Sequence, residues 1–170
     1  MSVASVAAVL PDLWQVVYDT SWATAIRESE IVFPVLETIH VLTLALIAGT
    51  ISIVDLRLLG LVLKDEPAAE IERRIVPATW AGFAVMVITG ALLLGSEAAK
   101  LEHNPAFLIK LVLLVLAGSN VIFFQFFAHP KLAGLEPGRP APPVARISAG
   151  LSLAIWAGVI AAGRAVAYYH

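Results

Sequence analysis

Four long apolar stretches constrain this chain more than any other feature of its sequence. Each is close to the ~20 residues that an α-helix needs to cross the hydrocarbon core of a membrane. In that core only helices and closed barrels satisfy every backbone hydrogen bond. We therefore predict an all-α integral membrane protein, a four-transmembrane-helix bundle with spans at residues 30–58, 77–96, 106–128 and 147–168.

The composition agrees with a membrane location. Hydrophobic residues make up 59% of the 170 residues, and the mean hydropathy is +0.87. Only 14% of the residues are charged, against about 25% in soluble domains. A soluble core of this size cannot absorb so much apolar surface. The length fits a single membrane domain, residues 1–170.

Charge and cysteine content exclude several classes of function. The net charge is −2 and no basic stripe is present, so nucleic acid is not an expected partner. The chain has no cysteine. That excludes disulfides, thiolate metal sites, thiol catalysis and the covalent attachment of a c-type haem.

The residues before the first span are predicted to form an interfacial helix at about 11–28. Trp14, Tyr18 and Trp22 recur every four residues there, and aromatic rings of this kind prefer the lipid headgroup region. A mobile leader is the alternative. At the other end of the first span, the apolar character continues to Leu63, which predicts a helical extension over residues 55–64.

The loop charges predict the orientation. Basic residues gather in the connections between spans one and two and between spans three and four: Arg57, Lys64, Arg73, Arg74, Lys131, Arg139 and Arg146. Cytoplasmic loops carry the excess of Lys and Arg. We therefore expect a multi-pass protein of a bacterial inner membrane with both termini in the periplasm.

With this topology, ionisable residues of different spans collect in the outer half of the bundle. They are Glu37, His40, Glu97, Lys110 and Arg164. Ionisable groups inside a membrane are costly, face the bundle interior and usually serve a function. The sequence therefore predicts a site in the outer half.

His40 is the candidate ligand for a b-type haem, because no other histidine of the chain lies deep in a span. An imidazole that binds iron needs a partner for its other nitrogen, and Glu37 or Thr43 is expected to supply it. Met86 and Lys110 are the two candidates for a second iron ligand. Lys110 would coordinate as a neutral amine, which burial favours, or it would contact a propionate.

Arg164 is expected to neutralise a propionate, since a guanidinium pairs with a carboxylate through two hydrogen bonds. Three alternatives remain open. Glu37 and Lys110 could form a structural ion pair with His40 as a core residue. Glu37, His40 and Met86 could handle copper in a metal-uptake or transport module. The chain could also be a structural accessory subunit of a membrane complex.

Several segments resemble known membrane proteins. They read "ETIHVLTLALIAGT", "DLRLLG", "RRIVPATWAGFAVMVITGALLL" and "NPAFLIKLVLLVLAGSN". This pattern is similar to a bacterial family of four-span proteins. More distantly it resembles the HemJ-type protoporphyrinogen oxidases and the CopD copper-resistance membrane domain. The resemblance covers about Glu37 to Asn120.

In the HemJ-type family a histidine of the first span and a lysine of the third support a b-type haem. These match His40 and Lys110, so the resemblance implies a redox or electron-transfer protein, with HemJ-like oxidoreductase activity as one form. Asn120 or Gln125 stands where HemJ-type proteins carry a further histidine, so protoporphyrinogen oxidation itself is not implied. Membrane lipid, a quinone or a redox partner subunit, and a homo- or hetero-oligomer are the expected partners.

Overall fold

A computed structural model describes residues 13–63, 68–132 and 140–168. These residues form helices and turns and contain no strand. Residues 13–18 are helical. The elements that follow are α2 (Ser21–Arg27), α3 (Val32–Leu58), α4 (Ala68–Ser96), α5 (Ala98–Leu101), α6 (Pro105–Phe123), the π-helix η1 (Phe124–Ala128), the 3₁₀-helix η2 (His129–Leu132), α7 (Pro143–Ala165) and the 3₁₀-helix η3 (Val166–Tyr168).

Four helical segments are long and apolar enough to cross a membrane, which confirms the predicted fold class. They are Val32–Leu58, Pro77–Ser96, Pro105–Leu132 and Pro143–Tyr168. The third span is longer than predicted, because the helix continues through η1 and η2. The fourth begins earlier, at Pro143. Proline is favoured in the first turn of a helix, since its missing N–H has no partner there anyway.

The predicted helical extension over residues 55–64 is wrong. Helix α3 ends at Leu58, and Gly60 adopts a left-handed conformation with φ +74°. The Leu61 N–H bonds the Leu56 carbonyl at 2.9 Å and the Gly60 N–H bonds the Arg57 carbonyl at 3.0 Å. This is the Schellman pattern that ends a helix at glycine.

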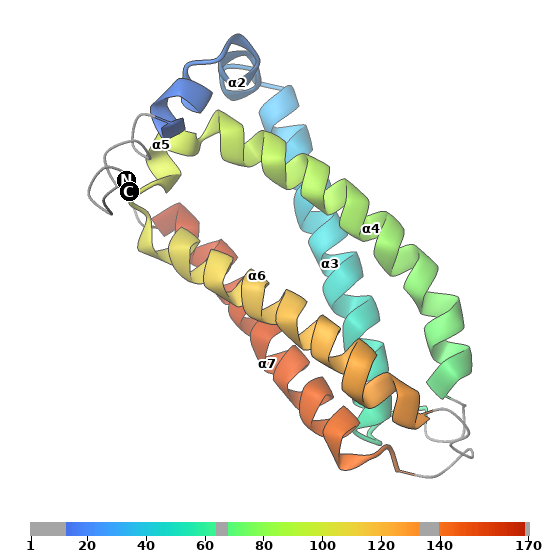
Figure 1. Ribbon diagram of the computed structural model, residues 1–170. Helices are drawn as coiled ribbons and strands as arrows, with labels where there is room; N and C mark the ends of the chain where they lie inside the picture. The colour runs from blue at the N-terminus through green and yellow to red at the C-terminus, as the bar shows by residue number, and fades with distance from the viewer. Residues whose placement is uncertain (1–12, 64–67, 133–139, 169–170) are drawn as a thin grey trace.

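The four long helices pack in two pairs, α3 with α4 and α6 with α7, and the pairs are joined by contacts between α3 and α7. Figure 1 shows the two pairs running alongside each other. Among the described residues α4 and α6 make at most marginal contact. We call the end formed by α2, α5 and η3 the outer end, and the opposite end, where α3 stops and α7 starts, the inner end (Figure 1).

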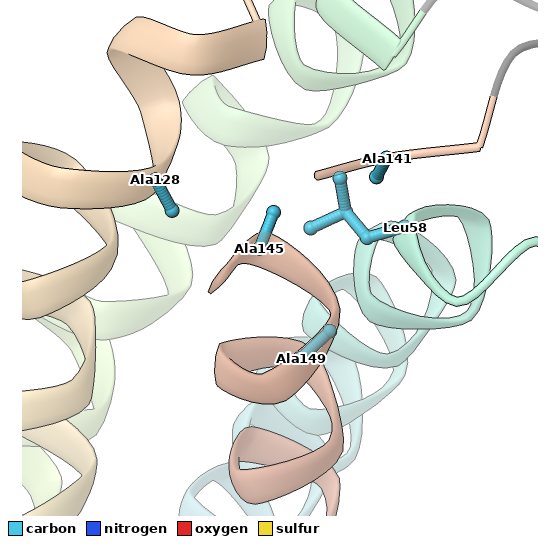
Figure 2. Close-up of a cluster of buried hydrophobic side chains, with 5 residues drawn as sticks. All are labelled: Leu58, Ala128, Ala141, Ala145 and Ala149. Atoms are coloured by element: carbon cyan, nitrogen blue, oxygen red, sulfur yellow. The ribbon is translucent and has the colours of Figure 1, made fainter. Parts of the chain in front are cut away.

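Small side chains close the inner end. Figure 2 shows Leu58 of α3 among four alanines from α7, η1 and the approach to α7: Ala128, Ala141, Ala145 and Ala149. All five are buried. Alanine lets helix backbones approach closely, which is how membrane helices gain packing energy. Polar contacts also hold the second pair together: Asn120 of α6 and Ser148 of α7 exchange two hydrogen bonds of 3.0 and 3.1 Å.

The predicted interfacial helix is divided in two. Residues 13–18 and α2 are separate short helices, broken at Asp19 and Thr20. Arg27 fixes this region to α4 by donating to the Ser96 carbonyl at 3.0 Å, and its guanidinium lies 3.8 Å from the centre of the Tyr18 ring. Trp14 makes an edge contact with Phe107 of α6. The segment therefore touches both α4 and α6 at the outer end.

Replacement of Gly95 by alanine is expected to displace the Trp22 ring from α4. An added Cβ would lie 2.9 Å from Cζ3 of Trp22 and closer still to Cη2. Overpacking of this kind costs about 1–3 kcal/mol of unfolding free energy. Thermal unfolding in detergent should show the loss, and tryptophan fluorescence should shift. Gly118→Ala is the matched control, because its Cβ would meet nothing within 4 Å. Equal unfolding temperatures and equal fluorescence spectra for the two variants would contradict the close contact between Gly95 and Trp22.

Candidate functional site

The deep histidine of α3 is held by a residue of the neighbouring helix. His40 is half-buried, and its Nδ1 lies 3.0 Å from the hydroxyl oxygen of Thr89 on α4. Thr89 is itself only 5% exposed. The expectation that Glu37 or Thr43 fills this role is not met. Glu37 is exposed, and the Thr43 hydroxyl donates to the Ile39 carbonyl of its own helix at 2.7 Å.

The Thr89 hydroxyl lies within hydrogen-bond distance of Nδ1 of His40, of the Val85 carbonyl at 2.8 Å and of the Met86 carbonyl at 3.3 Å. A hydroxyl has only one proton to donate. When it donates to a carbonyl of its own helix, it accepts from His40, and Nδ1 carries the imidazole proton. Nε2 then keeps its lone pair, which is the form of histidine that binds a metal.

A glycine makes room for the imidazole. A Cβ added to Gly90 would lie 3.1 Å from Cε1 of His40 and 3.7 Å from Nδ1. Gly90 follows Thr89 on α4, so one stretch of this helix supplies both the hydrogen bond and the space. The position of the ring is thus constrained from the α4 side.

Lys110 reaches the interior from α6. Its side chain packs over Gly163 of α7, where an added Cβ would lie 3.8 Å from Nζ. Lys110 and His40 are near enough to interact electrostatically. The bundle therefore brings together the two residues that the sequence pairs as candidate ligands.

The helix register brings the end of the Lys110 side chain near the level of His40. Ser152 of α7 hydrogen-bonds Asp55 of α3, so these positions are level. Eleven residues further along α7 is Gly163, and eleven residues back along α3 is Leu44. Leu44 is four residues from His40, about 6 Å along the helix. A lysine side chain is long enough to cover that offset.

The other residues that the sequence predicts for this site do not all face the interior of the bundle. Met86 is buried on α4, one turn from Thr89 towards the inner end. Glu37 and Arg164 are exposed. Arg164 follows Gly163, so it points roughly 100° around α7 from the surface that Lys110 covers. Glu97 forms an ion pair with Lys100 at 2.6 Å. His40, Met86 and Lys110 thus face the interior, whereas Glu37 and Arg164 do not.

Thr89 and Gly90 are the site residues that sequence reasoning did not single out. Both lie on the α4 face that also carries Met86. A threonine–glycine pair in an apolar helix is a weak signal, because small residues there usually serve helix packing. Only the antiparallel register of α3 and α4 shows that this pair meets His40.

The donor set around His40 is small. Within residues 13–63, 68–132 and 140–168, no group of three or more His, Cys, Asp or Glu side chains could enclose a metal ion. One imidazole and one amine or thioether are therefore the groups that the interior offers. This set fits a haem, because the porphyrin supplies four ligands and the protein needs to supply only one or two.

The fold and this site define a class: a four-span helical membrane protein whose described residues include one half-buried histidine. A hydrogen bond from the neighbouring helix positions this histidine in the outer half of the bundle. Residues 27–169 match the profile of a family described as a family of unknown function, DUF6644. The match spans most of the chain, so the chain belongs to this family. Comparison with curated proteins gave no match. Comparison with solved structures gave none either.

Proposed function

We propose that this protein binds one b-type haem in the outer half of its bundle and transfers electrons within the membrane. The observation that carries the proposal is the His40–Thr89 hydrogen bond, which is made by Nδ1, so that Nε2 is the ring nitrogen that would bind iron. The haem would supply one-electron redox chemistry. The protein supplies the axial ligand, its orientation and an apolar surrounding.

Each interior residue has a role in this proposal. His40 would hold the iron, and Thr89 is a positioning residue that holds the His40 ring. Lys110 would be a second iron ligand, or it would hold a propionate with its charge. Gly90 and Gly163 keep the space beside the two side chains open. Arg164 and Glu37, which are exposed, remain candidates for contacts at the outer rim, where propionates would meet water.

The marginal contact between α4 and α6 also supports a flat ligand. His40 is held from α4, and Lys110 projects from α6. Because these helices do not pack closely along their spans, a ligand between them would displace little helix–helix contact. A copper-handling module is less well supported, since Glu37 is exposed and the described residues hold no group of three or more His, Cys, Asp or Glu side chains that could bind a metal ion.

Haem titration tests the proposal directly. Protein purified in detergent from haem-depleted cells should bind added haem with saturation at one haem per chain. A Soret band should develop in step with quenching of tryptophan fluorescence. Failure to saturate at one equivalent would remove the haem proposal, and stoichiometric copper binding instead would favour the copper-handling alternative.

Removal of the Thr89 hydroxyl should weaken haem binding without abolishing it. Loss of a group that orients a metal-binding histidine costs about 10–100-fold in affinity. We expect Thr89→Val to lose affinity in this range and to shift the reduction potential. Thr43→Val is the matched control, because that hydroxyl bonds only its own helix. Equal affinities for the two variants would show that Thr89 does not position the ligand.

The orientation gives an independent prediction, with both termini in the periplasm of an inner membrane. A reporter that is active only in the cytoplasm should be silent when fused after His170. The same reporter should be active when inserted at Gly138. The opposite pattern would place the His40 site in the cytoplasmic half and exclude a periplasmic redox partner.

A further inference from the structure

A buried carboxyl group lies at the inner end, far from the His40 site. Asp55 is on α3, one turn before the helix ends at Leu58, and only 7% of its surface is exposed. It lies 15 residues from His40 along the helix, or about 22 Å. Asp55 faces α7, where Ser152 hydrogen-bonds its side chain.

The second oxygen of this carboxyl is not satisfied. Oδ2 of Asp55 is buried and has no hydrogen-bond partner among the described residues. Ser148 and Asn120 are nearby polar groups, but they are bonded to each other: the Ser148 hydroxyl donates to Oδ1 of Asn120, and Nδ2 of Asn120 donates to the Ser148 carbonyl. The Ser148 hydroxyl has thus used its one proton, and Asn120 makes no hydrogen bond to Oδ2 of Asp55.

The charged groups of the surrounding elements do not compensate either. Arg57 is buried on the same helix and makes interactions of its own. The others lie at the inner end of the neighbouring elements: Arg146 on α7, Glu70, Arg73 and Arg74 on α4, and His129 and Lys131 on η2. Glu70 is bound by Arg73 and Arg74. Among described residues, Ser152 is the one side chain that interacts with the Asp55 carboxyl.

An ionised carboxylate in this position would be costly. A charge in an apolar interior needs a counter-charge or several hydrogen-bond donors, and without them it takes up a proton instead. Asp55 has one donor, Ser152, and the residue one turn further along α3, Leu58, belongs to the buried apolar cluster that includes Ala145 and Ala149. Protonation of the Asp55 carboxyl removes its negative charge, so that no counter-charge is needed.

We propose that Asp55 is a proton-binding site of this protein, neutral at neutral pH and open to proton exchange from the inner end. Its ligand is the proton, held on the carboxyl group while Ser152 donates to it. The site is independent of the haem proposal, because it shares no residue with the His40 region. Its position one turn from the end of α3 makes the inner side the shorter route for exchange.

Infrared spectroscopy of the protein in lipid vesicles tests this proposal. At neutral pH the wild type should show a carboxylic acid C=O band that shifts in D₂O and is missing in Asp55→Asn. Asp19→Asn is the matched control: Asp19 is exposed and accepts from Gln15, so this variant should keep the band. ¹³C labelling of the aspartate carboxyls gives the same assignment in the unaltered protein, because Asp55 is the aspartate within a span.

The same vesicles test from which side Asp55 exchanges its proton and whether its ligand is a proton or a metal cation. Raising the pH on the side that the loop after α3 faces should remove the band faster than raising it on the other side. Absence of the acid band at neutral pH would overturn the proposal, since Asp55 would then be ionised. Loss of the band on adding Na⁺ or K⁺ at constant pH would also overturn it, because the carboxylate would then hold a metal cation.

Discussion

The variant His40→Ala is expected to lose its haem completely. No other histidine of the described residues lies within the apolar part of a span: His103 precedes α6, and His129 begins η2 at the inner end. Removal of the axial imidazole therefore leaves no replacement nitrogen at this level. The purified variant should show no Soret band and no extractable haem, whereas the wild type should show one haem per chain.

Two controls make this result interpretable. His103→Ala and His129→Ala should keep the wild-type haem content, since both side chains are exposed. His40→Ala should still purify as a folded helical protein, because a half-buried ring that packs on Gly90 leaves only a small space behind. Unchanged haem content in His40→Ala would mean that the iron is held elsewhere.

The second large effect separates the two candidates for the other iron ligand. If Lys110 coordinates iron, Lys110→Met should keep the haem, change its spectrum and raise its reduction potential, since thioether ligation raises the potential. Met86→Leu should then change little, because this swap nearly preserves the core volume. We expect this outcome, because Lys110 lies close enough to His40 for an electrostatic interaction.

The opposite result, a large effect of Met86→Leu and a small effect of Lys110→Met, would identify Met86 as the second iron ligand. Met86→Leu would then give a high-spin or ligand-accessible iron, and Lys110→Met would lower only haem retention. Unchanged spectra in both variants would mean that neither side chain is a ligand. Redox titration of the two variants in parallel with the wild type distinguishes these outcomes.

The sequence predicts the spans well because each one is a long apolar run bordered by charged or helix-limiting residues. Pro77 and Pro143 stand at or near the starts of two spans. The end of α3 is harder to predict, since the apolar run continues past Leu58 to Leu63. There the backbone conformation of Gly60 ends the helix, although the hydropathy does not change.

The candidate site is less predictable than the spans. The position of His40 within a span follows from counting residues, but its partner on another helix depends on how α3 and α4 are aligned. That alignment brings Thr89 and Gly90 to the imidazole, whereas the nearer residues Glu37 and Thr43 do not hold it.

One measurement tests the central proposal most directly: the visible absorption spectrum of the protein purified from haem-replete membranes, recorded before and after reduction with dithionite. We predict a Soret band that sharpens and shifts on reduction, with haem and protein present in equal molar amounts. A colourless protein from such membranes would contradict the assignment of His40 as a haem ligand.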